Sequence, residues 1–346
     1  MHFQLRNVLA LTDRNNIFFS TGDQVCSYHP ITHTLREPLL DLGEDTLSDP
    51  IRISTLGGCG GANAVVMAGG FNGTFALKPL NTNLSDPPIT GTLTRDENGI
   101  TNHIQLIRSR HTGTPHAVAC SNDKFIRIVD TFYPRRFLAQ HPFDWAINCS
   151  ATSPDSRLRA VVGDTIEVLI VDAERGRTEF VLPGHQDYGF AAAWSDDGYT
   201  LATGNQDQTV RIFDARNLSE TLKVFPMRMA GCRTLRFAPG GGVLAMAEPA
   251  DLVHIVDSRK WEGMQTLQFW GEVGGMEFTP DGEELVIANT DRFVGGIMTW
   301  RRKGGWGEEE EEEGGFEVPK DGGIVLGSGR RRRRSAGVKG LDRVFV

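Results

Sequence analysis

The side chains that could carry out chemistry in this 346-residue chain form no recognisable catalytic or metal-binding pattern. It contains nine histidines and five cysteines, but their spacings do not fit a zinc site. His29 and His33 are four residues apart, and Pro30 between them argues against the helix that such a ligand pair requires. The glycine-rich run at 57–61 precedes a β-like segment, so it lacks the helix N-terminus that a phosphate-binding loop needs. We therefore expect no enzymatic activity, no metal and no cofactor.

The composition disfavours several other classes of protein. The longest unbroken apolar run, residues 64–68, has five residues, whereas roughly 20 are needed to span a bilayer. The first 300 residues carry 25 Lys and Arg against 35 Asp and Glu, an acidic balance that disfavours nucleic acid as a partner. The scattered cysteines are typical of reduced, buried thiols, and the N-terminus shows no secretory signal. We expect a protein of the cytoplasm, the nucleus or both, with no membrane and no small-molecule substrate.

The elements that must position any site recur at a nearly constant interval. Four β-like segments end in an aspartate, at Asp130, Asp172, Asp214 and Asp257, with intervals of 42, 42 and 43 residues. A further 43 residues lead to Trp300 in a similar segment. Repetition at 40–45 residues is typical of proteins in which each repeat forms one small antiparallel sheet.

Within one period, short β-like runs alternate with turn residues. Residues 187–195 are followed by the turn 196–198, then by the run 199–204, the turn 205–208 and the run 209–214. This alternation predicts β-hairpins, and no segment has helical periodicity. Weaker copies extend the series to seven units, which predicts an all-β fold: a seven-bladed β-propeller of four-stranded antiparallel blades. We place the propeller at 1–300 and a charged low-complexity tail at 301–346, with blades at about 5–48, 49–101, 102–141, 142–184, 185–227, 228–270 and 271–300.

One unit carries a specific family pattern. Gly184 and His185 stand at its start, a Trp-Ser-Asp-Asp-Gly turn follows at 194–198, and Asp207 occupies the second turn. Residues 184–214 therefore resemble a WD repeat closely, and roughly 5–300 resemble the WD-repeat family by spacing and turn residues. Residues 274–300 are also similar to a segment near the end of a group of fungal WD-repeat proteins of unassigned function.

The resemblance implies a buried hydrogen-bonded network in this unit. In WD repeats a His, a Ser or Thr, an Asp and a Trp form it, and the matching positions here are His185, Thr203, Asp207 and Phe213. Phe213 has no indole N–H, so one link of the network is missing. We expect His185 to donate to Asp207 and Thr203 to join them.

The aspartate of the second turn recurs along the chain. Its simplest role is to cap the turn, because Asp side chains bond their own backbone nearby. This reading is favoured over a catalytic one for the whole set, which comprises Asp23, Asp123, Asp164, Asp207, Asp251 and Asp291.

Four large side chains are candidates for binding a partner. Trp145 and Tyr188 are one period apart, each after an aspartate, and Trp270 and Arg228 fall in comparable loops. Aromatic and Arg side chains often anchor interfaces, and loops of rigid scaffolds carry function. We expect these four to surround one mouth of the channel; the alternative is that the rings pack between blades.

The last blade needs an outer strand from the tail, because only about four residues precede the first strand. Residues 315–318 or 323–326 could supply it. The tail also contains the glutamate run 308–313 and the arginine run 330–334, whose like charges repel and favour a solvated chain. The arginines could alternatively form a nuclear-import patch, a nucleic-acid contact or a kinase-recognition site.

The sequence thus predicts a non-catalytic scaffold that binds a protein or peptide at the propeller face. The resemblance also allows a more specific role, the substrate receptor of a ubiquitin ligase. A propeller-fold hydrolase or lyase is the third alternative, and it would require carboxylates or histidines that converge in the central channel.

Overall fold

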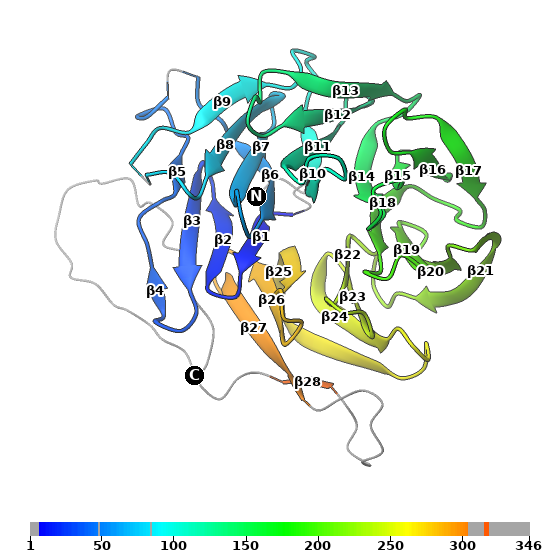
Figure 1. The fold of residues 1–346 in the computed structure, drawn as a ribbon. Helices are drawn as coiled ribbons and strands as arrows, with labels where there is room; N and C mark the ends of the chain where they lie inside the picture. The colour runs from blue at the N-terminus through cyan, green and yellow to red at the C-terminus, as the bar shows by residue number, and fades with distance from the viewer. Residues whose placement is uncertain (1–6, 48, 84, 304–314, 318–346) are drawn as a thin grey trace.

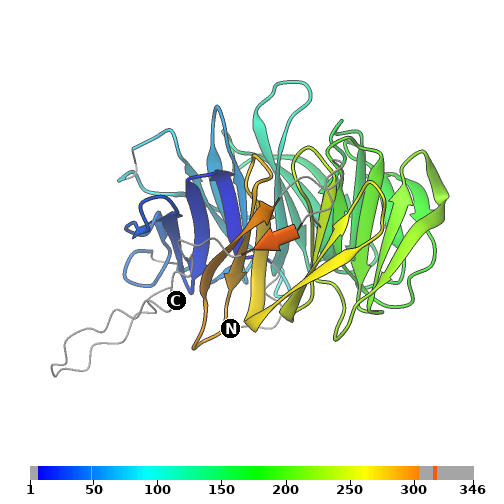
Figure 2. The same ribbon diagram turned by 90° about the horizontal axis from the view of Figure 1, so that it is seen from below.

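The chain folds into seven antiparallel blades arranged around a central axis (Figure 1). The computed structural model describes residues 7–47, 49–83, 85–303 and 315–317. These residues contain β-strands and turns and no helix, so the predicted β-propeller is confirmed. Seen from the side, the ring is a short cylinder in which strands run roughly parallel to the axis (Figure 2).

Each blade begins with its innermost strand and proceeds outward. Blade 1 contains β1 (Leu9–Asp13), β2 (Asn16–Thr21), β3 (Gln24–His29), β4 (Thr34–Leu35) and β5 (Leu40–Asp41), of which β4 and β5 both pair with β3. Blade 2 contains β6 (Ile53–Cys59), β7 (Val65–Gly70), β8 (Thr74–Pro79) and β9 (Ile89–Thr92). Blade 3 contains β10 (Thr101–Arg108), β11 (Pro115–Ser121), β12 (Phe125–Asp130) and β13 (Phe137–Pro142).

The remaining blades follow the same order. Blade 4 contains β14 (Ile147–Thr152), β15 (Leu158–Gly163), β16 (Val168–Asp172) and β17 (Thr178–Leu182). Blade 5 contains β18 (Gly189–Trp194), β19 (Thr200–Asn205), β20 (Thr209–Asp214) and β21 (Asn217–Pro226). Blades 6 and 7 share one sheet, formed by β22 (Thr234–Phe237), β23 (Val243–Ala247), β24 (Ala250–Asp257), β25 (Met264–Phe278), β26 (Glu284–Asn289), β27 (Gly296–Lys303) and β28 (Gly315–Glu317).

The long strand β25 explains why six sheets make seven blades. Its first part pairs with β24 as the outer strand of blade 6, and its second part pairs with β26 as the inner strand of blade 7. The chain therefore passes from rim to centre without the loop that separates the other blades.

The repeated aspartates mark the ends of four third strands, β12, β16, β20 and β24. The carboxylate of Asp172 accepts hydrogen bonds from the backbone N–H groups of Glu174 and Arg175, at 3.0 and 2.7 Å. Asp214 accepts one from Arg216 at 2.9 Å. The period in the sequence is thus a series of turn caps that end the third strand and start the outer one.

The apolar core lies between adjacent blades. One cluster joins Cys149 and Val162 of blade 4 to Trp194 and Phe213 of blade 5, and equivalent clusters follow around the ring. Each blade buries both faces against its neighbours, as the argument from the repeats predicts.

Both ends of the propeller meet at blades 7 and 1. The N–H of Val8 donates to the carbonyl of Gly274 at 2.8 Å, and β28 pairs with β27 as the outer strand of blade 7. Residues 315–317, and not an N-terminal segment, supply that strand. The other proposed closing segment at 323–326, the glutamate run 308–313 and the arginine run 330–334 lie outside the described residues. In the part of the chain that the structure describes, no helix is long and apolar enough to cross a membrane.

Candidate interaction face around the channel mouth

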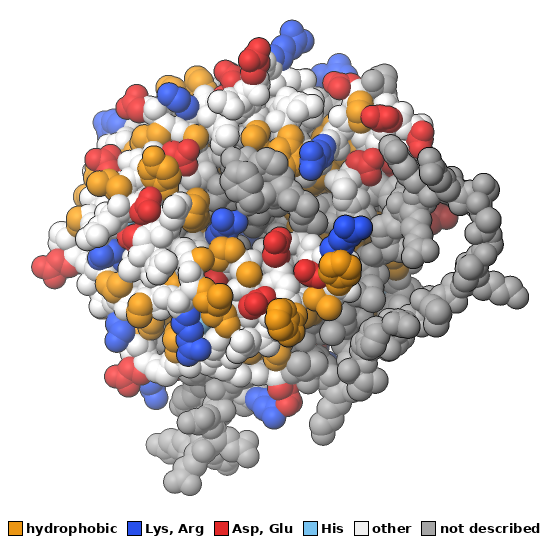
Figure 3. All heavy atoms as spheres, turned by 180° about the vertical axis from the view of Figure 1, so that it is seen from behind, with side chains coloured by type: hydrophobic (Ala, Val, Ile, Leu, Met, Phe, Trp, Pro, Cys, Tyr) orange, Lys and Arg blue, Asp and Glu red, His pale blue; other side chains and the backbone are white. Residues whose placement is uncertain are grey.

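The candidate partner-binding residues lie on one face of the ring. The loop before each inner strand and the turn between the second and third strands lie at the same edge of the blade, because successive strands are antiparallel. Figure 3 views this face and shows hydrophobic side chains gathered on one part of it. We call it the entry face.

Three of the four predicted residues are presented to solvent there. Trp270 is 83% exposed, Tyr188 is 46% exposed, and Arg228 is exposed. Trp145 is only partly exposed, because its ring packs against Phe143 with ring centroids 5.7 Å apart. Trp145 therefore belongs partly to the packing between blades, and the other three can contact a partner.

Other exposed apolar side chains on this face were not predicted. Met229 lies beside Arg228 and is 65% exposed, and Phe293 and Val294 lie in the turn between β26 and β27. Phe293 is 83% exposed. Together, Met229, Trp270, Phe293 and Val294 form what we call the apolar arc. The available sequence signal was the apolar pair Phe293 and Val294, which stands two residues after the turn aspartate Asp291.

Trp270 lies not in a loop, as predicted, but at a bulge of strand β25, and this bulge is fixed from two sides. The side chain of Asn289 donates to the Trp270 carbonyl at 2.6 Å, and Asp251 accepts the Gly271 N–H at 2.9 Å. Gly271 has a φ of +127°, and a Cβ there would lie 2.1 Å from the Asn289 side-chain oxygen. A glycine is required at this position by both backbone conformation and space.

The turn that carries Phe293 and Val294 is held by its aspartate. Asp291 accepts hydrogen bonds from the backbone N–H groups of both residues, at 2.7 and 3.0 Å. These bonds favour the charged carboxylate and hold the pKa of Asp291 below its usual value.

A buried Glu–His pair fixes the loop that carries Arg228 and Met229. The Glu248 carboxylate accepts the N–H groups of Arg228, Met229 and Ala230, each at 2.7 Å. His254 Nε2 lies 2.9 Å from the same carboxylate, and its Nδ1 lies 3.0 Å from Thr266 Oγ1. Both ionisable side chains are inaccessible to solvent.

The charge of Glu248 is favoured despite its burial. Burial acts to raise the pKa of the carboxyl group, but hydrogen bonds from His254 and the three backbone N–H groups outweigh it and lower the pKa. The loop is therefore anchored by an ionised group. No feature of the single sequence distinguished Glu248 from an exposed turn glutamate.

The WD-type network of blade 5 has the predicted members in contact. His185 Nδ1 lies 2.8 Å from Asp207 Oδ2, and His185 Nε2 lies 2.9 Å from Thr203 Oγ1. Thr209 adds a hydroxyl that donates to Asp207 at 2.7 Å. Phe213, in the place of the usual Trp, is fully buried in the core between blades 4 and 5.

Replacing Asp207 with Ala should lower the free energy of unfolding by about 1–3 kcal/mol, because His185 would be left buried without its acceptor. Burial acts to raise the pKa of Asp207, but bonds from His185, Thr209 and the Gln186 N–H hold it well below its usual value. Urea denaturation at pH 7 measures the loss. Asp187→Ala is the matched control, because Asp187 is a partly exposed aspartate two residues beyond His185 whose carboxylate accepts the Tyr188 N–H outside the network; equal effects of the two changes would contradict the network.

The other turn aspartates use their carboxylates differently. Asp123 forms a buried ion pair with Arg127, and Asp164 accepts the Asn148 side-chain amide at 2.8 Å. Asp23 lies against Gly43, where a Cβ would be 2.4 Å from its Oδ2. Only part of the set caps its own turn. Asp164 instead ties its turn to the inner strand β14 through Asn148, and Asp251 ties its turn to the later segment at Gly271 in β25.

In the part of the chain that the structure describes, no group of three or more His, Cys, Asp or Glu side chains is placed to hold a metal ion. The five cysteines are free thiols.

Comparisons with known proteins agree with the fold. The family described as "WD domain, G-beta repeat" matches residues 176–214. Coronin-7 of Rattus norvegicus is 42% identical over 52 residues, or 15% of this chain and 6% of coronin-7. Coronin-7 of Homo sapiens is 41% identical over 61 residues, or 18% of this chain and 7% of that protein. The chain thus matches less than a tenth of the length of these relatives. The family model thus matches one repeat of this chain, and the seven-bladed propeller is a fold that WD repeats build.

Proposed function

We propose that this protein is a non-catalytic scaffold that binds a protein or peptide partner on the entry face. The observation that carries the proposal is the apolar arc, in which Trp270 on strand β25 and Phe293 in the turn after β26 are each 83% exposed. Large apolar side chains that extend into solvent from rigid loops are typical anchors of protein interfaces. Arg228, beside the arc, adds a cation that can pair with an acidic group of the partner.

The segments of the arc are held in place before any partner binds. Asn289 donates a hydrogen bond to the Trp270 carbonyl, and the carboxylates of Asp291 and Glu248 accept backbone N–H groups of the other two segments. A surface that is ordered in advance loses less conformational entropy on binding. This arrangement favours recognition of a partner by a preformed surface.

Affinity purification from the native cell, followed by mass spectrometry, identifies the partner. A double change of Trp270 and Phe293 to Ala should reduce recovery of that partner at least tenfold, since interface anchors contribute about 2 kcal/mol or more each. Phe132 and Tyr133 are also exposed, in the turn after β12 at the opposite face. Changing these two to Ala is the matched control, and it should leave recovery unchanged.

Two results would contradict the proposal: equal loss in both double variants, or full recovery with the arc variant. Recovery of ubiquitin-ligase subunits with the wild-type protein would narrow the scaffold role to that of a substrate receptor. We also propose a cytoplasmic or nuclear location, which a fluorescent fusion of the full chain tests.

A further inference from the structure

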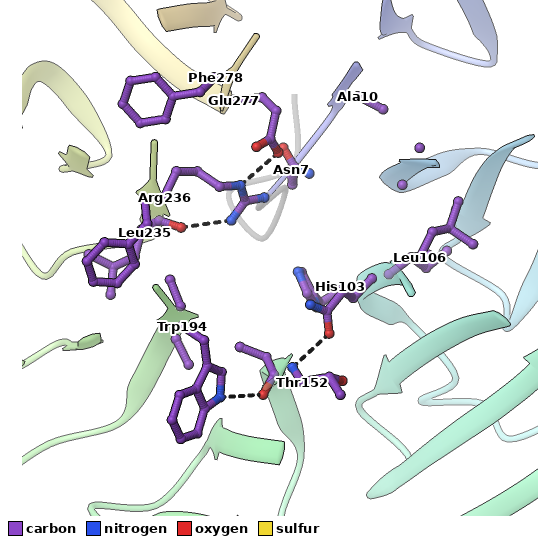
Figure 4. Close-up of a pocket in the computed structure, with 18 of the residues that line it drawn as sticks. Asn7, Ala10, His103, Leu106, Thr152, Trp194, Leu235, Arg236, Glu277 and Phe278 are labelled. Carbon is purple, nitrogen blue, oxygen red and sulfur yellow. Dashed lines mark hydrogen bonds and ion pairs between the residues drawn. The ribbon is translucent and has the colours of Figure 1, made fainter. Parts of the chain in front are cut away.

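A second candidate site lies inside the central channel. The inner strands enclose a cavity of about 460 Å³ that reaches the first-turn loops, where Pro154, Asp196 and Pro280 line it. These loops lie on the face opposite the entry face. Figure 4 shows side chains from several blades pointing into this space.

The cavity has room for a ligand because one ring of inward residues includes two alanines. The strand registers place Gln105, Ala151, Ala193, Arg236 and Glu277 at the same level of five successive inner strands. Two alanines therefore stand beside the two charged residues. The space beside these alanines is lined by the long polar side chains of Gln105, Arg236 and Glu277.

Arg236 and Glu277 form an ion pair at this level. Arg236 Nε lies 2.8 Å from Glu277 Oε2, and Arg236 Nη1 donates to the Leu235 carbonyl at 2.9 Å. The described residues provide no hydrogen-bond acceptor for Nη2. One end of the guanidinium therefore remains available to a ligand.

His103 lies one level further toward the entry face. It is 8% exposed, and neither ring nitrogen hydrogen-bonds to a described residue; Nδ1 is sealed from solvent. Burial, together with the charge of Arg236, lowers the pKa of His103 to about 3. A buried imidazole without a partner is costly, and it is suited to bond a group that enters the channel.

The next level toward the first-turn face is apolar. Leu106, Phe237 and Phe278 line the cavity there. A ligand in the channel would therefore meet Arg236 and His103 at one end and hydrocarbon at the other.

We propose that the channel binds a carboxylate that carries an apolar group. The carboxylate lies between Arg236 and His103, and the apolar group lies among Leu106, Phe237 and Phe278. An apolar residue at the end of a peptide chain and a free aliphatic acid share this chemistry. The site is distinct from the proposed partner surface, so either proposal can fail without the other.

Charge balance favours protonation of His103 when the carboxylate binds. Two anions, the ligand and Glu277, would then face two cations. The ionisable and charged groups around the site are His103, Arg236, Glu277, Asp196, Cys149 and Arg233. Between the pKa values of free and ligand-bound His103, binding should thus take up a proton, and affinity should fall toward tenfold per pH unit over that range.

Isothermal titration of the full chain with hexanoate, N-acetylleucine and N-acetylleucinamide tests the site. We expect the two acids to bind with one-to-one stoichiometry and the amide to bind at least tenfold more weakly. Tighter binding of acetylleucine than of hexanoate would indicate a chain end, and the reverse a free acid. Equal binding of acetylleucine and its amide, or no binding by either acid, would overturn the proposal.

NMR titration of the His103 imidazole in the wild-type protein gives a second measurement that needs no variant. Without ligand, the imidazole should stay neutral down to pH 5, and saturating hexanoate should raise its pKa above 5. An unchanged His103 titration would refute the carboxylate contact. The paired change Arg236→Gln with Glu277→Gln keeps the site neutral, and it should remove acid binding.

Discussion

Replacing Glu248 with Ala is expected to lower the free energy of unfolding by about 3–5 kcal/mol, the range seen when one member of a buried ion pair is removed. Three backbone N–H groups at 228–230 would lose their acceptor, and His254 would lose the carboxylate 2.9 Å away. Their environment is dry, since both side chains are fully buried. Urea denaturation at pH 7 measures the loss, and partner recovery should fall with it because the 228–230 loop carries part of the apolar arc.

The matched control for Glu248 is Glu167→Ala. Glu167 is an exposed glutamate in the corresponding turn of blade 4, and its removal should change stability by less than about 0.5 kcal/mol. Similar losses in the two variants would show that the buried contacts of Glu248 contribute nothing specific.

Lowering the pH should decrease the free energy of unfolding of the wild-type protein through protonation of Glu248. That pKa is lower in the folded than in the unfolded state, so the contribution is complete above the unfolded value of about 4.3 and is lost as pH falls below it. Glu248→Ala should therefore flatten the decline of stability below about pH 4.3. If the stability of Glu248→Ala declined in acid as steeply as that of the wild type, Glu248 would not be the group responsible.

The architecture could be predicted because its signals are local and repeated. Asp130, Asp172, Asp214 and Asp257 each end a third strand, so one turn cap, repeated at a fixed interval, reveals the ring without any long-range information. The contacts of His185 could be predicted for a different reason: three of the four members of the family network, His185, Thr203 and Asp207, are kept in that unit. Phe213 shows that the blade keeps its packing without the indole N–H.

The parts that sequence reasoning missed depend on contacts between distant segments. Trp145 and Trp270 were predicted in comparable loops, but the Trp145 ring rests on Phe143, whereas Trp270 lies in strand β25 and extends into solvent. The role of Glu248 follows from three N–H groups about twenty residues earlier, and that of His103 from Arg236 on another blade. Neither spacing nor residue type encodes these neighbours.

Asp123 and Arg127 provide the sharpest test of a buried charge pair in this ring. Arg127 donates to both carboxylate oxygens of Asp123, at 2.9 and 2.6 Å, and both side chains are more than nine-tenths buried. Asp123→Ala should cost about 3–5 kcal/mol of unfolding free energy, because the Arg127 charge would be left buried without a counter-ion. Urea denaturation of the full chain measures this loss.

A double-mutant cycle separates the pair from its surroundings. Arg127→Met removes the charge and keeps an apolar chain beside Phe125, over which the guanidinium now lies at 4.8 Å from the ring centroid. The double variant with Asp123→Ala and Arg127→Met should lose much less unfolding free energy than the two single variants added together. The reason is that the double variant contains neither charge, so no buried charge is left unpaired. Additive losses would mean that the two residues act independently.

The pH dependence of the cycle supplies an independent check on Asp123. Burial acts to raise the pKa of its carboxyl group, but bonds from Arg127, Thr94 and Ser121 outweigh it and lower the pKa. The stabilisation is therefore present above the unfolded value of about 3.9 and disappears as pH falls through the lower folded value. The coupling energy from the cycle should accordingly decrease between pH 5 and pH 2, whereas a coupling that is constant over this range would exclude an ionic origin.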